Sequence, residues 1–156
     1  MIHELLAAYE ASALGHAARN TVWLYPIANL VHVLGASLLV GAIAVFDILV
    51  LRGRYQIAAS AGSVAIPLAA TGLALQAASG LVLFSAEATT IAGNPAFLFK
   101  MAMLVVGLAN VAAFHAWHRV SALAEEGHGP AARLGALVSL GVWILVLLAG
   151  RAIAYG

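Results

Sequence analysis

The residues of this sequence that could do chemistry are ionisable side chains inside long apolar segments. A charged group in the hydrocarbon core of a membrane is costly, so such residues usually face a partner or a functional cavity. Imidazole nitrogens are common ligands of haem iron and copper, and a nearby cation can bind the propionates of haem. In chain order, these ionisable residues are His32, Asp47, Lys100, His115 and Arg151.

Four of these residues form two pairs with the same spacing. Fifteen residues separate His32 from Asp47, and fifteen separate Lys100 from His115. Fifteen residues of helix cover about 22 Å and return to within roughly 60° of the same face. The spacing therefore predicts two polar layers, with His32 and Lys100 near one membrane face and Asp47 and His115 near the other. We expect Asp47 and His115 to hydrogen bond with each other.

Structural interpretations of the same residues stay open. Asp47 can equally pair with Arg52 or Arg54, which follow it at the membrane interface. Lys100 lies about one turn inside its apolar segment, where its aliphatic stem can extend outward and place the ammonium in water. Each of these interpretations removes one residue from a functional site.

The composition excludes several classes of protein. Hydrophobic residues make up 64% of the 156 residues and charged residues only 8%, against about a quarter charged in a soluble domain. A net charge of +1 without a cluster of basic residues excludes nucleic acid as a partner. The absence of cysteine excludes thiolate metal sites, iron–sulfur clusters and covalently attached haem. We therefore expect an integral membrane protein in which any redox chemistry uses a non-covalently bound cofactor.

Long intervals without charge define the elements that position these residues. They predict an all-α fold, an integral membrane four-helix bundle within a single domain at 21–156. The opening segment, 1–20, has acidic and basic residues among Leu and Ala and lacks the pattern of a signal peptide, which predicts an amphipathic helix on the membrane surface. The four transmembrane helices are expected at 24–51, 63–86, 96–118 and 132–153.

The distribution of arginines predicts an orientation. Lys and Arg accumulate in cytoplasmic loops, and Arg52, Arg54, Arg119 and Arg133 all lie near the ends of predicted helices on one side. The other side has only Arg19 in a segment clearly outside the membrane. We therefore expect a bacterial cytoplasmic (inner) membrane protein with both termini outside the cytoplasm.

An ordered set of short motifs covers nearly the whole chain. They are WLYP at 23–26, VHVLG at 31–35, VFDIL at 45–49, NPAFLFK at 94–100, Asn110, FH at 114–115, GR at 150–151 and AY at 154–155. This set resembles an uncharacterised family of bacterial four-helix membrane proteins. More distantly, His32 and Lys100 resemble the histidine and lysine of the haem-binding membrane protoporphyrinogen oxidase family and of the copper-resistance D-type proteins. The resemblance to the oxidases implies that His32 is a haem ligand.

These observations predict a membrane-embedded b-type haem protein. It would pass electrons between quinone, or another membrane donor, and a partner on the outer face such as a periplasmic redox protein. Gly35, one turn from His32, is expected to make room for the flat macrocycle, and Arg151 or Arg19 to meet the propionates. The candidate cofactor-binding residues are His32, Lys100, His115 and Arg151, and those that can ligate the metal directly are His32 and His115.

Other functions fit the same sequence. A copper-handling transport protein would use His32 with Met101 and Met103, and a metal site shared by His115 and His118 has suitable helical spacing. A cofactor-free accessory subunit of a membrane complex needs none of these residues. The distant resemblance adds an enzyme of porphyrin oxidation. Small residues along the predicted helices also suit a homo-oligomer.

Overall fold

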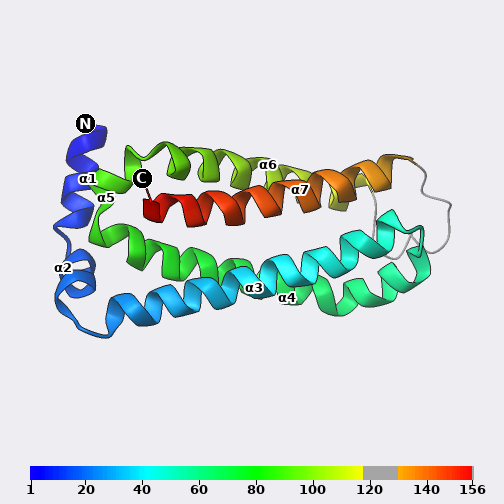
Figure 1. Cartoon of the computed structure of the whole chain (residues 1–156), viewed down its shortest axis with the longest axis horizontal. Helices are drawn as coiled ribbons and strands as arrows, with labels where there is room; N and C mark the ends of the chain where they lie inside the picture. The colour runs from blue at the N-terminus through cyan, green and yellow to red at the C-terminus, as the bar shows by residue number, and fades with distance from the viewer. Residues whose placement is uncertain (118–129, 156) are drawn as a thin grey trace.

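Four long helices run side by side through the molecule (Figure 1). The computed structural model describes residues 1–117 and 130–155, and it contains helices and no strand within those residues. Each long helix has the length and composition needed to cross a membrane. This confirms the prediction of an all-α, multi-pass membrane protein. The long helices are α3 Leu24–Leu51, α4 Tyr55–Ala86, α6 Pro95–Trp117 and α7 Pro130–Ala152.

The observed helix limits follow the predicted ones closely, with one exception. Helix α3 matches its predicted range, α6 and α7 begin one and two residues early, and the predicted last residue of α6 lies outside the described residues. Helix α4 begins at Tyr55 instead of at residue 63. Its first turns are rich in Ala and Ser, which lowered their apparent hydrophobicity, yet Ser60 bonds back to the Gln56 carbonyl and remains helical. The connection to α3 is therefore a short turn.

That turn depends on a glycine. Helix α3 ends at Leu51, and Gly53 adopts a φ of 70°, which non-glycine residues rarely adopt. The Gly53 and Arg54 amides then donate to the Val50 and Leu49 carbonyls, which satisfies acceptors at the helix end. The chain can therefore reverse within three residues and start α4 immediately.

The opening segment forms two helices, not the single predicted helix over 1–20. They are α1 Ile2–Glu10 and α2 Ala13–Asn20, and Ser12 caps the second by accepting from the Gly15 amide. Figure 1 shows both lying across one end of the bundle beside the short helix α5 Ala88–Ala92. Gly15 allows this packing, because a Cβ there would lie 2.7 Å from the Ser85 carbonyl oxygen. Their placement on a membrane surface stays a prediction.

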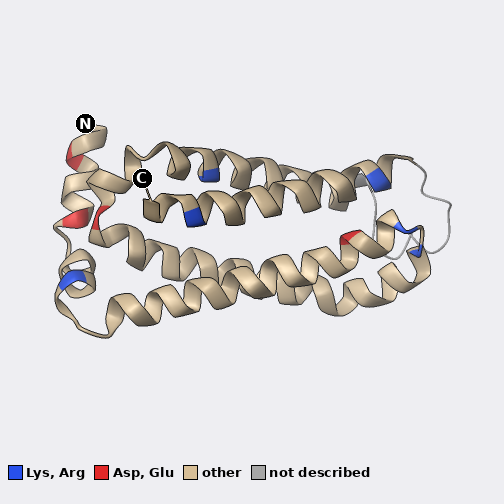
Figure 2. Cartoon of the chain, viewed as in Figure 1, with Lys and Arg blue, Asp and Glu red and all other residues tan. Residues whose placement is uncertain are grey.

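The two ends of the bundle differ in composition. Both termini lie at the end covered by α1, α2 and α5, which we name the terminal end (Figure 1). Arg52, Arg54 and Arg133 lie at the opposite end, which we name the arginine end. Figure 2 shows charged residues mostly towards these two ends, with an uncharged middle. Termini at one end are what an even number of membrane crossings requires.

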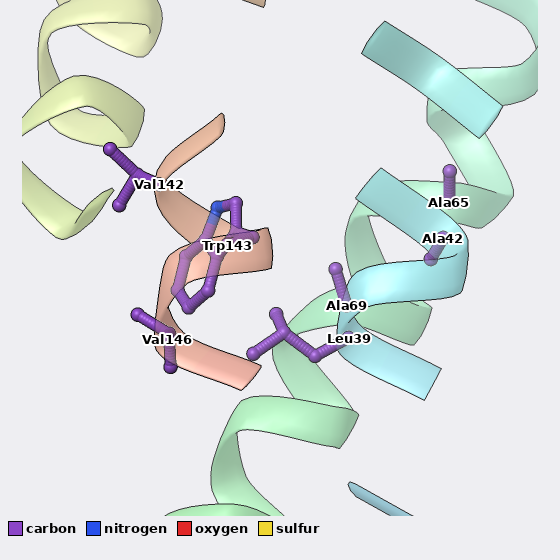
Figure 3. Packing of buried hydrophobic residues seen from close by; sticks show 7 residues of the cluster. All are labelled: Leu39, Ala42, Ala65, Ala69, Val142, Trp143 and Val146. Atoms are coloured by element: carbon purple, nitrogen blue, oxygen red, sulfur yellow. The ribbon is translucent and has the colours of Figure 1, made fainter. Parts of the chain in front are cut away.

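The helices do not all pack equally closely. Helix α3 packs closely on α4, where Gly35 and Gly72 face each other and a Cβ on Gly35 would lie 2.8 Å from the Gly72 carbonyl oxygen. Helix α7 packs on both α3 and α6 through the large ring of Trp143, whereas α6 packs mainly on α7. Figure 3 shows the resulting core cluster of Leu39, Ala42, Ala65, Ala69, Val142, Trp143 and Val146.

Candidate functional site

His32 and Lys100 lie in contact near the terminal end. The Lys100 Nζ atom is 3.4 Å from the His32 Nε2 atom, and both side chains are half-buried. His32 belongs to α3 and Lys100 to α6, so this contact joins two helices that are not neighbours in the chain. The prediction that these residues share a depth in the membrane is confirmed, and we refer to them as the His32–Lys100 pair.

Ser79 of α4 fixes the orientation of the His32 ring. The His32 Nδ1 atom is 3.0 Å from the Ser79 Oγ atom, and the Ser79 hydroxyl donates its proton to the Leu75 carbonyl of its own helix. A serine has one proton to donate, so Oγ accepts from the Nδ1–H of His32. This assigns the proton to Nδ1 and leaves the lone pair of Nε2 directed at Lys100. Ser79 is not among the predicted site residues, because an uncharged hydroxyl in an apolar segment gives little signal.

Three further residues shape the surroundings of the pair. The buried Gln76 side chain donates to the His32 carbonyl at 3.4 Å, which ties α4 to α3 at this depth. Gly80 leaves space for the imidazole, since a Cβ there would lie 3.2 Å from the His32 Cε1 atom. Gly150 likewise leaves space for the Lys100 ammonium, since a Cβ there would lie 3.6 Å from the Lys100 Nζ atom. Small residues therefore surround both nitrogen donors.

The pair contains nitrogen atoms of the kind that could hold haem iron, namely His32 Nε2 and, when neutral, the Lys100 amine. A metal-ligating histidine usually donates its other ring nitrogen to a hydrogen-bond acceptor, as His32 does to Ser79. The Lys100 Nζ and His32 Nε2 atoms are in direct contact at 3.4 Å, so the two side chains would have to separate for either to hold haem iron. The prediction that Gly35 makes room for a macrocycle is wrong, because Gly35 packs against Gly72. A macrocycle here needs space between α6 and the α3–α4 hairpin, where helix packing is looser.

The predicted contact between Asp47 and His115 is wrong. The exposed His115 ring has its Nδ1 atom 2.8 Å from the Val111 carbonyl oxygen of its own helix, and Asp47 is buried against α7. The 60° offset that fifteen residues leave is enough to turn His115 out of the bundle. His115 lies about 22 Å along α6 from Lys100, so it cannot share an iron with His32.

Asp47 instead lies near a serine of α7. The Ser139 hydroxyl is within hydrogen-bonding reach of the Asp47 carboxyl, and both residues are buried. Neither Arg52 nor Arg54 forms an ion pair with Asp47 in the described part of the chain, where the ion pair found joins the amino terminus to Glu4. The open alternative of an interfacial pair with these arginines is therefore also wrong.

The two arginines proposed for the propionates have other partners. Arg151 is exposed, donates to the Tyr155 hydroxyl and lies 4.9 Å from the centre of the Tyr155 ring. Arg19 donates to the Ala86 carbonyl at 3.0 Å and to the Glu10 carbonyl at 2.9 Å. Arg19 thereby caps the end of α4 and joins α2 to it. Of the predicted cations, Lys100 alone contacts His32.

The structure does not assemble the alternative metal sites. Met101 is exposed, and Met103 packs against the core cluster around Trp143. The described residues contain no group of three or more His, Asp or Glu side chains placed to hold a metal ion. His118, Arg119 and His128 lie outside the described residues.

A cap of polar and aromatic contacts covers the terminal end. The Glu10 carboxylate accepts from the Thr89 amide at 3.0 Å and from the Thr89 hydroxyl at 2.7 Å, and these hydrogen bonds lower the pKa of Glu10. The Tyr9 hydroxyl donates to the Leu81 carbonyl. The Phe84 ring stacks on Phe97, 5.3 Å between centroids. These contacts fix α1 and α5 beside the pair.

Comparison of the chain with protein-family models, curated proteins and solved structures gives no match. The assignment of function therefore depends on the geometry of the site.

Proposed function

We propose that this protein is a b-type haem protein that passes electrons within a bacterial cytoplasmic membrane, with His32 as an axial ligand of the iron. Bound haem supplies a one-electron iron couple. The protein would supply a ligand of fixed orientation at His32 and a cation at Lys100. Distant resemblance to haem-binding membrane oxidases is in line with this proposal and assigns the same two residues, His32 and Lys100.

One observation carries the proposal. The hydrogen bond from His32 Nδ1 to Ser79 leaves the Nε2 lone pair free of a proton and directed into the bundle. Haem binding would use this lone pair in place of its present contact with the Lys100 amine, 3.4 Å away. Nε2 is the usual ligand atom when a neighbouring acceptor holds Nδ1–H.

The donor set favours haem over a copper ion held by the protein alone. A macrocycle contributes four nitrogen ligands, so the protein needs to add only one or two. The pair offers that number, His32 through Nε2 and Lys100 through its amine when neutral. As an ammonium, Lys100 would bind a propionate instead. A bare copper site needs three or more side chains, and the His32, Met101 and Met103 set is not brought together.

The proposed orientation determines which side of the membrane the site lies on. If the arginine end faces the cytoplasm, as the distribution of basic residues favours, the His32–Lys100 pair lies in the outer half of the membrane. Haem there would exchange electrons with quinone or a membrane donor and with a periplasmic redox protein or another membrane subunit. A homo-oligomer would place two such sites in one assembly.

Absorption spectra of the purified protein, made with ample haem and recorded oxidised and reduced with dithionite, test the proposal. We expect a Soret band in the wild type and its loss in His32→Ala, with membrane insertion unchanged. His115→Ala is the matched control, because this exposed histidine lies at the other end of the bundle and should keep the band. A colourless wild type would overturn the assignment of haem as the cofactor. A coloured His32→Ala variant would overturn the assignment of His32 as the ligand.

A further inference from the structure

Asp47 is a buried carboxyl with half of its hydrogen-bonding capacity unused. Its side chain is 4% exposed, in the last two turns of α3. Ser139 lies within hydrogen-bonding reach of the carboxyl, but the Oδ2 atom has no partner among the residues that the structure describes. A buried polar atom without a partner is rare, and it calls for a physical explanation.

A second unpartnered atom lies on the facing helix. Trp143 is 1% exposed, and its Nε1–H has no acceptor within the described ranges. Trp143 follows Ser139 by four residues, which places it one turn further along the same face of α7. Figure 3 shows its Nε1 atom at the end of the ring nearer Val142. An unused donor therefore lies on the same face of α7 as Ser139, the neighbour of the unused acceptor.

No charged group of the described residues offsets a negative charge on Asp47. The Arg133 Nε–H donates to the Tyr55 hydroxyl, and the imidazole of His115 bonds the Val111 carbonyl. Arg52 and Arg54 follow Asp47 on α3 without pairing with it. A buried charge without a partner is costly in a membrane. Among the described residues, the titratable and charged side chains of this end, contributed by α3, α4, α6 and α7, are Arg52, Arg54, Tyr55, His115 and Arg133.

The hydrogen-bonding types of Asp47 Oδ2 and Trp143 Nε1 indicate what could bind between them. A metal cation bound at Oδ2 would face the Nε1–H of Trp143, which is a donor and repels cations. A water molecule instead accepts from Nε1–H and exchanges hydrogen bonds with Oδ2 in either protonation state of the carboxyl. Buried waters typically make two to four such bonds to otherwise unsatisfied groups. A water molecule and a proton therefore suit these two atoms, whereas a metal cation does not.

We propose that Asp47 is a proton-binding site of the membrane domain, with Oδ2 as the atom that takes the proton and one buried water joining it to Trp143 Nε1. Binding forms one O–H bond at Oδ2 and takes the proton from hydronium in the aqueous phase, with no change of oxidation state. Asp47 lies four residues before the end of α3, so the path to the arginine end is about one helical turn. The site does not depend on the cofactor at the other end of the bundle.

Infrared difference spectra of the protein in lipid vesicles test this proposal directly. On acidification across about pH 5 to 9, we expect the carbonyl band of a protonated carboxylic acid to appear, to shift in D2O and to be lost in Asp47→Asn. This variant keeps the side-chain shape, so its loss of the band with an unchanged helical signal reports the carboxyl alone. Glu87→Gln, on the exposed surface of the terminal end, is the matched control and should leave the band unchanged.

Trp143→Phe tests the water. The variant keeps an aromatic ring but removes Nε1–H, so we expect the Asp47 band to remain and to shift in frequency. The same band in wild type and variant would overturn the link to Trp143. No band in the wild type at any pH in this range would overturn the proton site. A change that follows sodium concentration at constant pH would assign the site to a cation and overturn the proposal as well.

Discussion

The polar groups at the two ends of this bundle differ in how many hydrogen-bond partners they have. At the terminal end, His32 has a partner for each ring nitrogen, Ser79 on one side and Lys100 on the other. At the arginine end, Asp47 has a partner for one oxygen, and the neighbouring Trp143 has none for its nitrogen. At the first site both ring nitrogens have protein partners, of which haem binding would replace Lys100, whereas the second site leaves a donor and an acceptor without a partner among the described residues.

Helix packing explains this difference. The terminal-end site draws on α3, α4 and α6, and its pair is half-buried because α6 packs loosely on the α3–α4 hairpin. The arginine-end site lies between α3 and α7, where packing is close and both side chains are buried. An open site can admit a large flat cofactor if α6 moves. At the closed site, the unpartnered atoms suit a proton and a water molecule.

The largest difference between the two sites is expected from Gly72→Ala. A Cβ on Gly72 would lie 2.6 Å from the Leu39 backbone nitrogen, so α3 and α4 have to separate. We expect the free energy of unfolding to fall by about 1–3 kcal/mol. Ser79 and Gln76 move with α4, so the His32 site changes, whereas the Asp47 site between α3 and α7 does not.

Thermal unfolding in detergent, together with the Soret and Asp47 infrared bands, measures this effect. Gly141→Ala is the control, because a Cβ at Gly141 meets no atom within 4 Å. Equal destabilisation by the two substitutions would show that the close α3–α4 contact does not stabilise the bundle.

A smaller effect is expected from replacing the serine at each site, Ser79 or Ser139. Ser79→Ala leaves the Nδ1–H of His32 without its acceptor, and Ser139→Ala removes the hydrogen-bonding neighbour of Asp47. Each should lower the free energy of unfolding by about 1 kcal/mol. Only Ser79→Ala should also shift the Soret band, since it frees the ring orientation, and only Ser139→Ala should shift the Asp47 carboxyl band. A Soret shift of the same size in both variants would contradict the separation of the sites.

The smallest effect is expected from the hydrogen bonds between Glu10 and Thr89 at the terminal end. Hydrogen bonds from Thr89 lower the pKa of Glu10 below its ordinary 4.5, so their contribution to stability is complete above pH 4.5 and is lost as the pH falls through the lower folded value. In wild type, exchange protection of the Thr89 amide should therefore decline in that acid range, after correction for intrinsic exchange. Glu10→Gln should remove this pH dependence, while Glu4→Gln keeps it. Unchanged protection on acidification of the wild type would refute the role of Glu10.

Much of this architecture is encoded in patterns that sequence reasoning can detect. Long uncharged intervals located the four spans, and the depth of His32 and Lys100 followed from counting residues along helices. Rotation about the helix axis was harder, as a 60° offset moved His115 from the interior to the surface. The start of α4 was missed because its Ala-rich first turns carry hydroxyl side chains that bond to their own backbone.

The partners of both sites were missed for a different reason. Ser79, Gln76, Ser139 and Trp143 have no formal charge, and in an apolar helix such residues are ordinarily packing or backbone-bonded. Their roles appear only once α4 and α7 are placed against α3, which depends on glycine contacts such as Gly35 with Gly72. Ionisable residues indicate where a site lies, and tertiary packing decides which neutral residues complete it.

Chemical rescue of His32→Gly tests the central claim most directly. If His32 is the axial ligand, the variant should lack the Soret band, and added imidazole should restore the band by occupying the space of the lost ring. Imidazole should leave the spectrum of His115→Gly unchanged, because that histidine lies far from the site. A His32→Gly variant that keeps its Soret band without imidazole would contradict the assignment of this residue as the iron ligand.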